Sequence, residues 1–148
     1  MDIFISTLLL LLILYLIVFN LVDSYSRLLL IVSVFSFLRM HNVELKLLKL
    51  AITKTKYEKN RCDILYCIGM RHAKLKEFNR ATKYFLEAFT RNKNDFFFKK
   101  EYKIMLQSFV ETNKIEEGKI IYDLFLEKAE KEMKYKIITN TFEKYFNK

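Results

Sequence analysis

The sequence contains no proline and only two glycines among its 148 residues. Collagen-like chains need a glycine at every third position and flexible linkers are rich in proline or glycine, so both classes are excluded. A disordered tail is also excluded, because 52% of the residues are hydrophobic and 16% are aromatic. Since the two helix-breaking residue types are almost absent, the composition favours an all-α protein.

Cysteine is equally scarce, with only Cys62 and Cys67 in the chain. Two cysteines cannot build the dense disulfide framework of a small secreted domain, so a reducing compartment is expected. The two residues are five positions apart, which on a helix turns their side chains about 140° away from each other. This spacing predicts buried thiols rather than a redox pair or a pair of zinc ligands.

Charge is nearly missing from the first part of the chain. Residues 1–40 hold two acidic and two basic residues, so the formal net charge of +9 lies entirely in residues 41–148. No charge occurs from Ile3 to Val22, and twenty helical residues span about 30 Å, the thickness of a membrane's hydrocarbon core. These residues are predicted to form a transmembrane helix, not a cleaved signal peptide, because a positive start and a small-residue cleavage site are lacking.

A second apolar run extends from Leu28 to Leu38. Taken as residues 24–40, it could form the second leg of a membrane hairpin or lie on the membrane surface, and we prefer the hairpin. Basic residues then crowd the flank from Arg39 to Arg61. The positive-inside rule therefore predicts an integral protein of the cell membrane whose residues 41–148 are cytoplasmic and attract anionic lipid headgroups.

Residues 41–148 repeat apolar side chains at spacings of three and four, which predicts helices throughout. No alternating pattern of useful length indicates a strand. The predicted helices lie near residues 42–56, 61–75, 78–91, 96–112, 115–130 and 133–146.

The segment from Leu65 to Phe89 resembles a tetratricopeptide repeat, a helix-turn-helix unit of about 34 residues. The motif residues are Leu65, Ile68 and Gly69 on the first helix (helix A) and Phe78, Ala81, Phe85 and Ala88 on the second (helix B). The resemblance implies that the small residues let the two helices approach closely, while the phenyl rings fill the space between them.

A second unit follows with the same pattern, and Gly118 stands 37 residues after Ala81. Its helix A carries Tyr102, Met105, Leu106 and Phe109, its turn carries Asn113, and its helix B carries Ile115, Gly118, Tyr122 and Phe125. The predicted fold is a membrane anchor at 1–40 followed by a short tetratricopeptide-like α-solenoid at 41–148. Its parts are repeats at about 62–95 and 99–132, a half-repeat at 42–56 and a capping helix at 133–146.

Motifs for catalysis are missing. The sequence has no glycine-rich phosphate loop, no GxSxG and no HExxH. His41 and His72 have no acidic residue or cysteine at the spacing of metal ligands, so packing or surface roles are expected for both. We therefore predict no catalytic, cofactor-binding or metal-binding residue, and a protein that is not an enzyme.

The resemblance also implies a binding surface, because such repeats bind peptides on the concave face of their A helices. On this chain that face is predicted to consist of Tyr66, Met70, Lys74, Lys100, Lys103 and Gln107. With three lysines and no acid, it suits an acidic segment of a protein partner. The predicted function is a non-catalytic membrane-anchored scaffold. The alternative is a membrane-tethered nucleic-acid-binding protein, although the lysines are scattered over all helices rather than clustered in one groove.

Overall fold

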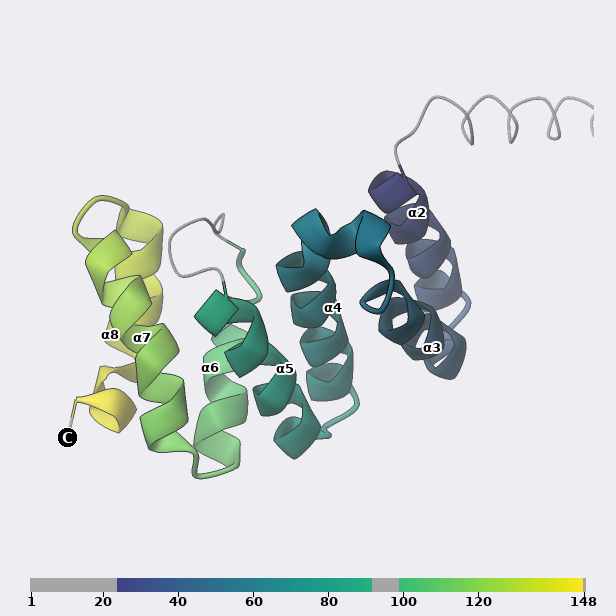
Figure 1. The fold of residues 1–148 in the computed structure, drawn as a ribbon. Helices are drawn as coiled ribbons and strands as arrows, with labels where there is room; N and C mark the ends of the chain where they lie inside the picture. Colours follow the sequence, from purple (N-terminus) through teal and green to yellow (C-terminus); the bar gives the residue numbers. More distant parts are fainter. Residues whose placement is uncertain (1–23, 92–98, 148) are drawn as a thin grey trace, which may run out of the picture. The chain divides into compact units, whose positions relative to one another are not determined.

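The computed structural model describes residues 24–91 and 99–147. Within these residues the chain forms seven α-helices and one 3-10 helix and no strand, so the described part is all-α (Figure 1). The chain divides into two compact units, unit 1 (Met1–Leu47) and unit 2 (Leu48–Lys148). The division falls inside helix α3 (His41–Ala51), seven residues beyond the predicted domain boundary after residue 40.

Unit 1 contains helix α2, which runs over Ser24–Phe37. The helix ends because Arg39 adopts a left-handed backbone conformation with φ of 57°. The amide of Met40 then donates to the carbonyl oxygen of Phe35 at 2.9 Å, and the amide of Arg39 donates to that of Ser36 at 3.1 Å. These two bonds satisfy carbonyl groups at the helix end in the manner of a Schellman motif.

The prediction of a membrane anchor is corrected by the described structure. Helix α2 has 14 residues, which span about 21 Å and fall short of a hydrocarbon core of about 30 Å. The prediction that residues 24–40 form the second membrane-spanning leg of a hairpin is therefore wrong. The predicted transmembrane helix at 3–22 lies outside the described residues.

No helix in residues 24–91 and 99–147 is long and apolar enough to cross a membrane. The predicted fold class, with its transmembrane helix or hairpin, and the predicted location as an integral membrane protein are not supported by this structure. They were inferred from two apolar stretches: residues 3–22, which lie outside the described residues, and residues 24–40, of which α2 takes in only Ser24–Phe37.

Unit 2 holds the remaining helices: η1 (Thr55–Asn60), α4 (Arg61–Lys74), α5 (Phe78–Arg91), α6 (Tyr102–Glu111), α7 (Ile115–Ala129) and α8 (Met133–Phe146). Helices α4, α5, α7 and α8 match their predicted bounds to within one residue. The predicted helix at 42–56 is broken instead, because α3 ends at Ala51 and Lys54 is extended before η1 begins. Helix α6 begins at Tyr102, later than the predicted residue 96.

Two turns in unit 2 share one geometry. Lys76 and Asn113, the turn residues between α4 and α5 and between α6 and α7, both have positive φ, 60° and 55°. The amide after each turn residue donates to a carbonyl five positions back, from Glu77 to His72 and from Lys114 to Phe109, both at 2.9 Å. The same Schellman-type turn therefore recurs 37 residues apart, although neither turn contains glycine.

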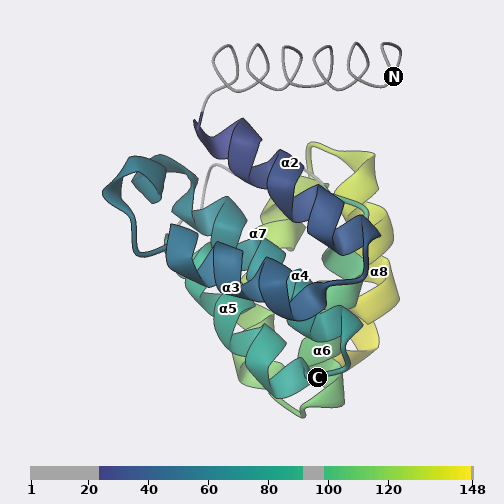
Figure 2. The ribbon, with the colours of Figure 1, turned by 90° about the vertical axis from the view of Figure 1, so that its right-hand side faces the viewer.

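The helices of unit 2 form two layers. Successive helices run in opposite directions from α4 to α8 (Figure 1). Helix α6 packs against both α4 and α8, while α5 packs against α7. Helices α4, α6 and α8 thus form one layer and α5 and α7 the other, as the view along the stack shows for α6 and α8 against α5 and α7 (Figure 2).

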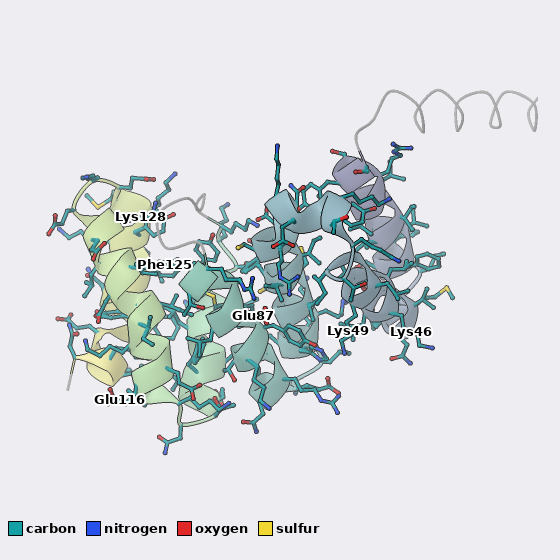
Figure 3. The ribbon with its side chains drawn as sticks, viewed as in Figure 1. Lys46, Lys49, Glu87, Glu116, Phe125 and Lys128 are labelled. Carbon is teal, nitrogen blue, oxygen red and sulfur yellow. The ribbon has the colours of Figure 1, made fainter. Side chains whose placement is uncertain are left out.

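Aromatic rings fill the space between the layers. Phe125 of α7 is fully buried, and its ring centroid lies 5.0 Å from that of Tyr102, 5.5 Å from that of Tyr135 and 5.9 Å from that of Phe89. One ring therefore joins α5, α6, α7 and α8. Figure 3 shows Phe125 between Glu116 in the first turn and Lys128 in the last turn of α7, where their charges oppose the helix dipole.

Candidate protein-binding surface

The predicted groove residues lie on the two neighbouring helices α4 and α6 and on the turn before α6. Lys74, Lys100, Lys103 and Gln107 are exposed. Tyr66 and Met70 are 8% and 7% exposed and belong to the core of unit 2. The accessible part of this face is therefore polar and basic, and its two apolar members mainly hold α4 in place.

The three lysines are spread along the face. Asp63 pairs with Lys99 and Tyr66 contacts Tyr102, so each residue of α4 lies level with the residue 36 positions later. By this register Lys74 of α4 lies beside Val110 of α6. Val110 is seven residues after Lys103, so Lys74 and Lys103 are about 10 Å apart along the direction of the helices. Lys100 and Lys103 thus mark one end of the surface and Lys74 the other.

Lys99 lies at the end of this face, next to Tyr66. Its ammonium lies 4.4 Å from the centroid of the Tyr66 ring and 3.4 Å from a carboxylate oxygen of Asp63. The Tyr66 hydroxyl is buried without a hydrogen-bond partner in the described structure, and burial raises its pKa well above the ordinary value. Sequence reasoning missed Lys99 and Asp63, because no local pattern joins residues 36 positions apart.

The predicted repeat-packing residues all lie in the interior or at its edge. Ala81, Phe85, Ala88 and Tyr122 are at most 4% exposed, Gly69 and Gly118 are buried, and Phe78 packs against the core from its edge. A Cβ on Gly69 would lie 2.6 Å from the Phe85 ring. A Cβ on Gly118 would lie 2.7 Å from the Cβ of Phe109, so both glycines stand where helices nearly touch.

His72 forms a short contact with Glu77 that the sequence did not reveal. It is 1% exposed, its Nδ1 lies 2.6 Å from a carboxylate oxygen of Glu77, and its ring stacks on that of Tyr84 at 5.4 Å. The hydrogen bond to His72, helped by nearby Arg80, lowers the pKa of Glu77 below its ordinary value of 4.5. Through His72, the turn between α4 and α5 is therefore linked to α4 by the Glu77 contact and to α5 by the stacking on Tyr84.

The Glu77 contact predicts a dependence of stability on acid. A carboxylate whose pKa is lower in the folded chain stabilises the fold above its unfolded pKa and loses that effect as pH falls through the folded pKa. Between about pH 5 and pH 3, urea unfolding should therefore show a smaller loss of stability for Glu77→Gln than for the parent chain. The exposed Glu127, replaced in the same way, is the control and should leave the acid dependence unchanged; equal acid dependence in all three chains would refute the prediction.

The two cysteines are half-buried rather than buried, and neither forms a disulfide. Burial raises the pKa of the Cys62 thiol, and neighbouring Asp63 adds to the effect, so the thiol is poorly ionised. No group of three or more histidine, cysteine or acidic residues within 24–91 and 99–147 could hold a metal ion.

A pocket of about 580 Å³ lies where the turn between α6 and α7 meets the end of α8. It is lined by Val110, Asn113, Ile115, Glu116, Lys119, Tyr145 and Phe146. Lys119 is already paired with Asp123 at 3.1 Å, so the pocket offers few convergent polar groups for a small molecule.

Comparisons of the whole chain with protein-family models, with curated proteins and with solved structures give no match. The function is therefore inferred from the side chains of this molecule alone.

Proposed function

We propose that unit 2 is a non-catalytic, tetratricopeptide-like docking module that binds an acidic segment of a protein partner on the face formed by α4 and α6. One observation carries the proposal. Lys74, Lys100 and Lys103 are exposed on this face, and no ion pair joins any of them to another residue of the described chain. Their charge is available to a partner, and steering by such charges favours acidic ligands.

The arrangement of helices supports the choice of module. Two-layer stacks of short antiparallel helices present the helices of one layer side by side, which leaves an extended surface for a peptide. The recurrence of the same turn at Lys76 and Asn113 fits two successive units of such a stack. A tetratricopeptide unit has about 34 residues, so the interval of 37 residues leaves three extra residues. We assign these three residues to the connection between α5 and α6.

Charge reversal at one end of the face tests the proposal. Replacing Lys100 and Lys103 by glutamate changes the local charge by four units, from +2 to −2, at exposed positions where folding should be little affected. Crosslinking in intact cells followed by mass spectrometry should then recover the partner at least about fivefold less efficiently than with the parent chain.

A matched double variant separates this surface from general charge. Lys83→Glu with Lys131→Glu makes the same change in charge at two exposed positions on α5 and on the turn after α7. This variant should crosslink to the partner as efficiently as the parent chain does. Equal losses with the two variants, or a partner that is nucleic acid and dissociates steeply with added salt, would refute the proposal.

A further inference from the structure

We propose a second docking surface, on helix α2 of unit 1, that accepts an amphipathic helix of another protein with acidic residues beside its apolar stripe. This inference does not rest on the function proposed for unit 2, because it concerns other residues and another kind of ligand contact.

Helix α2 is apolar on two opposite faces. Leu28 and Val32 are each 8% exposed and form its buried side. On the other side, Leu30, Val34 and Phe37 are 50%, 47% and 84% exposed. The spacings of four and three residues align these three side chains in one stripe along the helix.

Other apolar side chains widen the stripe. Ile31 on α2 is 39% exposed, and Leu38 and Met40 in the turn that follows α2 are 56% and 44% exposed. Exposed apolar residues usually stand singly on a protein surface, whereas six of them on one helix and the turn after it are typical of an interaction site. Since the stripe follows one helix and has helical spacing, a second helix that packs along it would cover it best.

The exposed charges of unit 1 select the partner. In residues 24–47 the exposed charged groups are Arg39 and Lys46, both positive, and the one acidic residue, Glu44, is 5% exposed. Arg39 directly follows the stripe and forms no ion pair with another described residue. A second copy of residues 24–40 would bring two arginines and no acidic residue to the stripe, whereas an acidic helix would be attracted.

Photo-crosslinking of the full chain in cells tests the proposal. The photoreactive residue p-benzoylphenylalanine replaces Phe37 on the stripe, and in a control chain it replaces Ile137, which is 66% exposed on α8. We expect the probe at position 37, and not the one at 137, to form an adduct with a helical peptide of another protein that has acidic residues next to its apolar stripe.

Two variants measured with the same probe define the contact. Leu30→Ser with Val34→Ser removes apolar side chains and should lower the yield of this adduct about tenfold or more. Arg39→Glu should lower it about twofold to fivefold, since a single exposed ion pair contributes little. Far-UV circular dichroism of both variants should match that of the parent chain.

Each other outcome contradicts the proposal. An adduct with a second copy of the chain, with residues 3–22 of the same chain or with lipid identifies a different occupant. A partner peptide without acidic residues, a yield that Arg39→Glu leaves unchanged, or no adduct at position 37 overturns the proposal equally.

Discussion

Replacing Phe125 by alanine is expected to lower the free energy of unfolding by about 3–5 kcal/mol, the usual cost of removing a buried ring. Phe125 is fully buried and contacts rings from α5, α6 and α8, so the cavity would be lined by three helices that cannot all close on it. Small domains are stable by only about 5–15 kcal/mol, and the loss would be a large part of that. Urea unfolding followed by far-UV circular dichroism measures it.

The neighbouring residue supplies the control. Leu126 is 36% exposed on the same helix, so Leu126→Ala should cost less than about 1 kcal/mol. Similar unfolding midpoints for the two variants would show that the aromatic contacts do not hold α7 to its neighbours.

Replacing Gly118 by leucine is expected to destabilise unit 2 by about 3 kcal/mol or more. Its Cβ alone would lie 2.7 Å from the Cβ of Phe109 and 2.8 Å from the Cε1 of Phe146. The Phe109 atom is attached to the backbone of α6 and cannot turn away, so α6 and α7 would have to separate. The rest of the leucine side chain would then meet a close-packed interior.

Smaller changes on α7 distinguish a steric effect from a general one. Gly118→Ala should cost less than Gly118→Leu, because alanine adds only the Cβ, whereas leucine forces three further carbon atoms into the same close-packed space. Ile120→Leu, at a position that is 45% exposed, should leave the unfolding midpoint almost unchanged. If all three variants unfold at the same urea concentration, α6 and α7 do not approach as closely as described.

Much of the secondary structure could be predicted from local patterns. Apolar residues at spacings of three and four mark α4, α5, α7 and α8, because each of these helices buries one stripe. The turns at Lys76 and Asn113 were found at polar breaks in that pattern, although lysine is not a residue that normally favours a positive φ. The end of α2 at Phe37 was placed at residue 40 instead, since arginine is not a residue type that marks a left-handed position such as Arg39.

The candidate surface was predictable only in part. The positions of Lys74, Lys100 and Lys103 on exposed faces follow from helical periodicity. The burial of Tyr66 and Met70 and the contact of Lys99 with Tyr66 do not follow, because they depend on how closely α6 lies against α4.

The sequence by itself determined the helical character of the described residues, the location of the net charge in residues 41–148, and the two glycines, Gly69 and Gly118, at which helices approach closely. Composition and periodicity are local properties, and a helix needs only its own side chains to show which face is apolar. Only the tertiary structure decided that Lys99, paired with Asp63, lies over the ring of Tyr66, and that Phe125 joins four helices. These features come from contacts between residues distant in sequence, whose geometry is set by packing rather than by any spacing along the chain.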